Sequence, residues 1–163
     1  MFDPVRICEI LNDERVEYII VGGFAAVVHG SSLPTKDIDV LPSRSPDNLD
    51  RLARALKRMK AQIPTSGDPV PAPIDRPFLA NMPLMLNLVT ELGELDLTFS
   101  PSGPLVGFEG WNEHAMAIEI AEGLTAKIAA LDDIIDSKRA ADRPRDHMAL
   151  PYLESLREQL GAD

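Results

Sequence analysis

The sequence predicts an α+β fold, in which a mixed, mostly antiparallel sheet is flanked by helices. Two observations lead to this prediction. Short apolar runs rich in β-branched residues alternate along the chain with amphipathic segments of helical period. Two pairs of these runs are separated by short turn-forming segments, as in the hairpins of an antiparallel sheet. The 163 residues suit a single domain, with an expected core over about residues 16–130 and C-terminal helices over about residues 131–160.

The first part of the chain places a glycine pair between a strand and a helix. Glu17 to Val21 is a nearly continuous apolar run, which predicts a buried strand, and Gly22-Gly23 ends it. Pro46 and Asp47 are typical of the first turn of a helix. In order, the sequence predicts a helix over 4–14, a strand over 17–21, a helix over 24–29, a strand over 37–41 and a helix over 46–60 with Ser45 as its N-cap.

The second part of the chain begins with a proline-rich connection. Residues 64–83 contain six prolines, which predicts a long segment without regular structure. The predicted elements that follow are strands over 84–89 and 94–99, a helix over 108–114, strands over 116–120 and 124–128, and helices over 131–141 and 146–159.

The charge of the chain limits its partners. With 16 Lys and Arg against 26 Asp and Glu, the net charge is −10, which argues against binding to duplex DNA and does not indicate RNA. The helix predicted over 46–60 carries several basic residues. These form either an ordinary solvent-exposed face or a patch that binds a polyanion. The single Cys8 excludes a disulfide framework within the chain. Without a signal-peptide pattern or a long apolar run, we expect a cytoplasmic protein that does not bind a membrane.

Three carboxylates are the candidate metal ligands. Asp37 and Asp39 lie two residues apart on a predicted strand, so both side chains leave the same face. Two such carboxylates repel each other. A hard cation bound between them, such as Mg²⁺ or Mn²⁺, would neutralise this repulsion. Asp96 lies in another apolar strand and joins the same ion if the two strands are neighbours. Glu94, on the same face as Asp96, is the competing third acid.

The glycine pair is the candidate anion site. Gly22 and Gly23 lie between a buried strand and a helix, where backbone N–H groups and the positive end of the helix dipole attract a phosphate. A phosphate can approach a glycine backbone closely.

These motifs resemble those of the nucleotidyltransferase superfamily, which has the DNA polymerase β-like fold. The family signature is an apolar residue followed by Gly-Gly or Gly-Ser, then Asp-x-Asp on a strand and a third acid on a neighbouring strand. Val21-Gly22-Gly23 and Asp37-Ile38-Asp39 match this signature, and Asp96 is the natural third acid. The resemblance covers about residues 16–150.

A small prokaryotic branch of the superfamily is more closely similar. The run from Gly22 to Gly30, the segment 35–39, the helix of residues 131–141 and the turn Arg143-Pro144-Arg145-Asp146 resemble that branch. Its members include nucleotidyltransferase-like toxins of toxin–antitoxin and abortive-infection systems. Where relatives often carry an arginine before the aspartate pair, this chain has Leu33-Pro34.

The resemblance implies transfer of a nucleoside monophosphate from an NTP to a protein, an RNA end or a small molecule. It implies that Asp37, Asp39 and Asp96 are the catalytic residues and hold Mg²⁺ or Mn²⁺. It also implies that the nucleotide is bound by Gly22, Gly23, Thr35, Lys36 and Lys138.

Two hypotheses follow from this resemblance. The first is an active enzyme, within a toxin–antitoxin or phage-defence module that supplies a cognate protein partner. The second is a catalytically weak or inactive member that binds a nucleotide or a partner protein. The three acids favour the first hypothesis and Leu33 favours the second.

Overall fold

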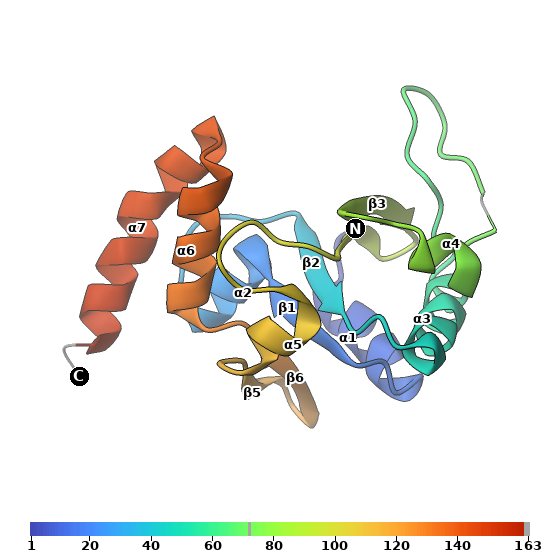
Figure 1. Cartoon of the computed structure of the whole chain (residues 1–163), viewed down its shortest axis with the longest axis horizontal. Helices are drawn as coiled ribbons and strands as arrows, with labels where there is room; N and C mark the ends of the chain where they lie inside the picture. The colour runs from blue at the N-terminus through green and yellow to red at the C-terminus, as the bar shows by residue number, and fades with distance from the viewer. Residues whose placement is uncertain (72, 162–163) are drawn as a thin grey trace.

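A computed structural model describes residues 1–71 and 73–161 of the chain (Figure 1). Its elements are α1 (Pro4–Asp13), β1 (Tyr18–Val21), α2 (Gly22–His29), β2 (Asp37–Pro42), α3 (Pro46–Arg58), α4 (Arg76–Ala80), β3 (Met85–Thr90), β4 (Gly93–Thr98), α5 (Gly107–Asn112), β5 (Met116–Ala121), β6 (Leu124–Ile128), α6 (Leu131–Ala141) and α7 (Pro144–Gly161). Within the described residues, none of these helices is both long and apolar enough to cross a bilayer.

The strands form one mixed sheet in the order β3-β4-β2-β1-β6-β5. The pairs β2–β4 and β1–β6 are parallel, and the other three pairs are antiparallel. The predicted α+β class and the mostly antiparallel sheet are therefore confirmed. The helices α6 and α7 lie side by side at one end of the molecule, and α3 and α4 lie at the other (Figure 1).

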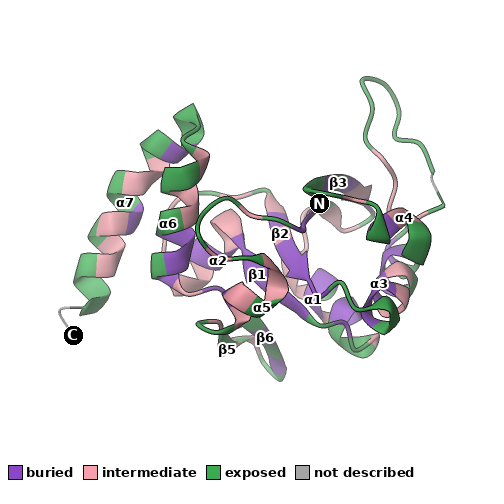
Figure 2. Ribbon diagram, viewed as in Figure 1, coloured by how far each residue is buried: buried purple, intermediate pink, exposed green. Residues whose placement is uncertain are grey.

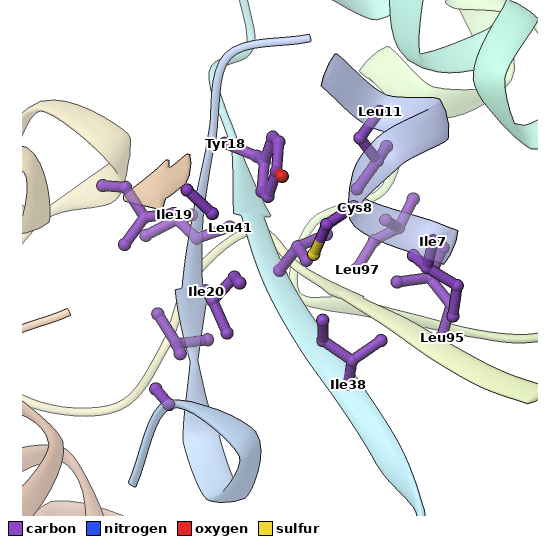
Figure 3. Packing of buried hydrophobic residues seen from close by; sticks show 14 of the residues in the cluster. Ile7, Cys8, Leu11, Tyr18, Ile19, Ile20, Ile38, Leu41, Leu95 and Leu97 are labelled. Carbon is purple, nitrogen blue, oxygen red and sulfur yellow. The ribbon is translucent and has the colours of Figure 1, made fainter. Parts of the chain in front are cut away.

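Strand alternation divides β2 and β4 into an apolar face and a polar face. Ile38 and Val40 pair with Leu95 and Leu97, and all four side chains are buried. Figure 3 shows side chains of α1, including Ile7, packed toward this apolar face. The intervening positions of both strands point the other way, since successive side chains of a strand alternate. The buried residues concentrate along the central strands and the inner sides of the helices (Figure 2).

The basic residues of α3 are partly used within the fold. Arg54 Nε lies 3.3 Å from a carboxylate oxygen of Glu14, and Arg58 contacts both Glu14 and Asp13. These ion pairs join α3 to the end of α1. Two basic side chains of the predicted patch therefore meet acidic residues of this chain.

The proline-rich connection contains more structure than the sequence predicted. Ile63 and Val70 exchange two backbone hydrogen bonds of 2.9 Å, and α4 forms further along. The side chain of Asp75 caps α4 by accepting a hydrogen bond of 3.0 Å from the N–H of Phe78. The helix also buries Leu79. An Asp N-cap before a proline in the first turn is a signal for the start of a helix. The prediction of an irregular segment over residues 64–83 did not take this signal into account.

Two helices start two residues earlier than predicted, whereas α3 starts at the predicted residue. The chain turns into α2 at Gly22, two residues earlier than predicted, because Gly22 adopts a φ of +69° directly after β1. The helix α7 begins at Pro144, where a proline is compatible with the first helical position. Ser45 is the N-cap residue of α3, but its side chain makes no capping hydrogen bond within the described ranges.

Replacing Leu97 by alanine is expected to lower the free energy of unfolding by about 2 to 5 kcal/mol, because it leaves a cavity between α1 and the sheet. Leu97 is fully buried. Urea denaturation followed by circular dichroism measures the change. Val106→Ala is the control, since Val106 is largely exposed, and its effect is expected within about 0.5 kcal/mol. Equal losses in both variants would contradict this account of the core.

Candidate active site

A cleft of about 830 Å³ opens over the polar face of β2 and β4. Its walls include the start of α2, the loop after β4 and the inner sides of α5 and α6. The lining residues combine acidic, basic and apolar side chains, which is the composition expected of a site for a charged ligand with an apolar part.

The three predicted acids meet on the floor of this cleft. Asp39 lies directly opposite Asp96 in the parallel pairing of β2 and β4, and Asp37 lies two residues before Asp39 on the same face. Each residue offers one carboxylate oxygen, and these atoms all lie within 4.8 Å of one another. This separation and these hard oxygen donors fit a Mg²⁺ or Mn²⁺ ion.

Glu94 lies outside this group. It is exposed and stands opposite Asp37 in the register, although its side chain also lines the cleft. Of the two candidate third acids, the described structure brings only Asp96 into the cluster. The difference follows from the parallel register, because Asp96 is level with the more deeply placed Asp39.

Burial and mutual repulsion change the ionisation of this cluster. Burial, with the charge of Asp37 as the second cause, raises the pKa of Asp39 above its ordinary range. Burial and the neighbouring Asp39 carboxylate raise the pKa of Asp96 to about 7. Both shifts express the cost of holding like charges together away from water. A divalent cation removes that cost, so the site favours binding one.

Gly22 lies against this cluster and leaves no room for a side chain. A Cβ atom built on Gly22 would lie 2.2 Å from the Oδ2 atom of Asp39, and the backbone has a φ of +69°. Only glycine meets both requirements without strain. The start of α2 is therefore held next to the carboxylates. Its N-cap residue, Val21, supplies no side-chain hydrogen bond within the described residues, so the first N–H groups of the helix are available to an anion.

Thr35 and Lys36 lie beside the cleft and not in its wall. Thr35 Oγ1 donates a hydrogen bond of 3.0 Å to the backbone carbonyl of Asp37, and it lies 3.4 Å from one carboxylate oxygen of the same residue. Lys36 is exposed. Neither is among the lining residues in the described ranges. Thr35 is thus placed to orient Asp37, and a contact of either residue with the nucleotide stays a prediction.

Lys138 reaches the cleft from α6, and its predicted contact with the nucleotide stays a prediction. Its side chain is 18% exposed, and its Nζ atom lies 3.6 Å from Asp146 Oδ1. Asp146 is fully buried and also binds Arg143, which donates from Nε over 2.7 Å and from Nη2 over 3.2 Å. Arg143 and Arg145 line the same wall. One buried carboxylate therefore fixes two cations at the edge of the cleft.

Asp146 remains ionised in this arrangement. Burial alone would raise the pKa of Asp146. The hydrogen bonds and charge of Arg143, together with the charge of Lys138, lower this pKa by more than burial raises it, so the pKa of Asp146 lies below its ordinary value. Asp146 was predicted only as the last residue of a turn motif. That it holds two cations at the cleft could not be predicted, because this depends on how α6 packs against α7. The basic residues close to Asp146 in the sequence were the available signal.

The replacement Gly22→Ala is expected to disrupt the cluster, because the new methyl group displaces the carboxylate of Asp39. We expect Mn²⁺ affinity to fall at least about tenfold, as for the loss of a residue that orients a metal ligand. Isothermal titration with Mn²⁺ measures this effect. Gly123→Ala is the matched control, since Gly123 has a φ of +72° and open space around it. Similar Mn²⁺ affinities in the two variants would show that Gly22 does not position Asp39.

The replacement Asp96→Asn is expected to stabilise the metal-free protein more at pH 8 than at pH 5. With a pKa of about 7, the folded carboxyl holds its proton at a pH where the unfolded carboxyl, with a pKa of about 3.9, has lost it. The free energy of unfolding of the unmodified protein therefore falls as the pH rises from about 4 to 7, and asparagine removes this loss. Urea denaturation in EDTA at both pH values tests the difference. Glu94→Gln is the control, and a stabilisation by Asp96→Asn that is equal at pH 5 and pH 8 would refute the prediction.

Comparison with solved structures identifies the fold. Lincomycin-bound LnuA, a lincosamide antibiotic adenylyltransferase, is similar over 93% of this chain and 94% of its own, with a TM-score of 0.61 and 15% identity. TM1012 of Thermotoga maritima, a proposed nucleotidyltransferase, is similar over 100% of this chain and 97% of its own, with a TM-score of 0.55 and 14% identity. Neither a protein-family model nor a curated protein matches the sequence. The predicted resemblance is confirmed at the level of the fold: the chain has the nucleotidyltransferase fold.

Proposed function

We propose that this protein is a metal-dependent nucleotidyltransferase that moves a nucleoside monophosphate from an NTP to an acceptor and releases pyrophosphate. The observation that supports this function best is the meeting of Asp37, Asp39 and Asp96 within 4.8 Å, beside the start of α2. The same cleft is lined by Lys138, so it offers groups for a metal ion and for phosphate together. The nucleotidyltransferase fold supports the same activity.

The acids have distinct roles in this proposal. Asp37 and Asp39 are the principal metal ligands, since they share one strand face and lie next to the start of α2. When bound, the divalent ions stabilise the attacking and leaving oxygens of an in-line displacement. Asp96 completes the ligand set and orients the attacking hydroxyl. As a carboxylate next to that hydroxyl, it can also accept the hydroxyl proton.

The remaining groups bind the triphosphate. The free N–H groups at the start of α2 and the close approach allowed by Gly22 and Gly23 form the phosphate cradle. Lys138 and Arg143, both held by Asp146, neutralise its charge. Arg143 and Arg145 also supply arginines at the cleft, which offsets Leu33-Pro34 at the position where relatives often carry one. The residue pattern therefore favours an active enzyme over an inactive binding module.

A small hydroxylated molecule is the acceptor that we propose. LnuA, whose name describes an antibiotic adenylyltransferase, is matched over nearly its whole length, which supports a small acceptor and an adenine nucleotide. The net charge of −10 gives no support to RNA. A place in a toxin–antitoxin or phage-defence module, with a cognate protein partner, stays a prediction that rests on the resemblance of the sequence.

Transfer of labelled nucleotide from α-³²P-ATP is expected with Mg²⁺ or Mn²⁺ and is expected to stop in EDTA. The chain itself and a mixture of hydroxylated small molecules are offered as acceptors. Asp37→Ala should lower the rate more than about 100-fold, because loss of a metal ligand exceeds the loss of an outer contact. Glu94→Gln is the control, since Glu94 lines the cleft outside the cluster. If the unmodified protein binds no NTP in calorimetry with either metal, the proposed function is wrong.

A further inference from the structure

Two buried polar atoms in the wall of the cleft lack a partner. Thr98 Oγ1 and Trp111 Nε1 are shielded from solvent and make no hydrogen bond within the described residues. Their side chains are 8% and 2% exposed, and both residues line the cleft that holds the three acids. Such atoms are rare in folded proteins, because a buried donor or acceptor left unpaired lowers the stability of the fold.

Thr98 lies on the strand that carries Asp96, and Trp111 lies on a helix that packs against the neighbouring strands. Thr98 lies two residues after Asp96 on β4, so both side chains leave the same face of the sheet, roughly 7 Å apart along the strand. Trp111 belongs to α5, which contacts β1 and β2 next to this strand. A molecule held by the acids can therefore extend over Thr98 and beneath α5.

The chemistry of the two atoms restricts what they bind. The indole N–H only donates a hydrogen bond, whereas the threonine hydroxyl can donate or accept. The bound group must therefore contain a hydrogen-bond acceptor. The nearby carboxylates repel an anion, and the cleft provides Lys138 on α6 and Arg143 just before α7 for phosphate. An uncharged group therefore suits these atoms, and a hydroxyl can pair with either one, because it accepts from the indole N–H and donates to or accepts from the threonine hydroxyl.

We propose that Thr98 and Trp111 form a subsite for a sugar hydroxyl of the substrate. This inference rests on the proposed function, which places an NTP in the cleft. The ribose of the NTP is the first source of such a hydroxyl, and a hydroxyl of the acceptor is the second. The subsite selects substrates through an uncharged oxygen, separately from the groups that hold the metal ions and the triphosphate.

The chain provides its own reporter for this subsite, since Trp111 is its one tryptophan. Fluorescence titrations with Mg²⁺ and ATP, 2′-deoxy-ATP or 3′-deoxy-ATP compare the unmodified protein with Thr98→Val, which removes the hydroxyl at nearly constant volume. Thr98→Ser keeps the hydroxyl and is the matched control. Calorimetry with Trp111→Phe tests the indole N–H. A final titration adds methyl β-D-glucopyranoside to the complex with Mg²⁺ and α,β-methylene-ATP, as a probe of an acceptor hydroxyl.

If the ribose occupies the subsite, one deoxy nucleotide binds about 5- to 10-fold more weakly than ATP to the unmodified protein and to Thr98→Ser, as expected for one lost hydrogen bond. Thr98→Val then binds ATP equally weakly and no longer distinguishes the two nucleotides, and Trp111→Phe also weakens ATP binding. If an acceptor occupies it, Thr98→Val leaves the three nucleotides unchanged and weakens the glucoside instead.

Two other results would count against the assignments. If Thr98→Val and Trp111→Phe match the unmodified protein toward every nucleotide and the glucoside, the two atoms bind water or only pack, and the subsite is refuted while the proposed function stands. If the unmodified protein binds neither ATP nor another NTP with Mg²⁺ or Mn²⁺, the proposed function itself fails. Both variants should unfold at the same urea concentration as the unmodified protein within about 1 M, which keeps a loss of binding separate from a loss of folding.

Discussion

The parallel pairing of β2 and β4 is the constraint on which the site depends. It places Asp39 level with Asp96 and brings three carboxylates onto one half-buried face. Holding like charges there is unfavourable, and burial together with this repulsion raises the pKa of Asp96. The surrounding structure is arranged around these charges. Gly22 leaves room for a carboxylate, the start of α2 offers N–H groups, and the wall at α6 carries cations.

The same two strands support the core and the site. Their apolar side chains pack toward α1, and their acidic side chains point into the cleft, so the core fixes the spacing of the three carboxylates. A similar division of labour occurs at the junction of α6 and α7. There the buried Asp146 holds Lys138 and Arg143, and two cations against one anion leave that wall positive. Rigid elements thus place opposite charges on different sides of one cleft.

Much of the fold and the centre of the site could be predicted from local patterns. Apolar runs marked the strands, and the spacing of Asp37 and Asp39 put both carboxylates on one face. Choosing Asp96 over Glu94 required the register of a parallel pair, which no local pattern encodes. The helix α4 was hidden by the prolines of the segment around it. The links among Lys138, Arg143 and Asp146, and the unpaired atoms of Thr98 and Trp111, depend on packing between elements distant in sequence, so a sequence alone could suggest the residues but not their contacts.

The order of the strands along the chain also affects when the acidic cluster forms during folding. Asp39 and Asp96 are neighbours in the sheet, yet α3, α4 and β3 lie between them in the chain. Such non-local parallel pairing forms only after the intervening chain has been closed into a loop, which is slow and entropically costly. The acidic cluster is therefore expected to come together late in folding. A nascent or partly folded chain has no complete cluster, so the proposed nucleotide chemistry would be confined to the native molecule.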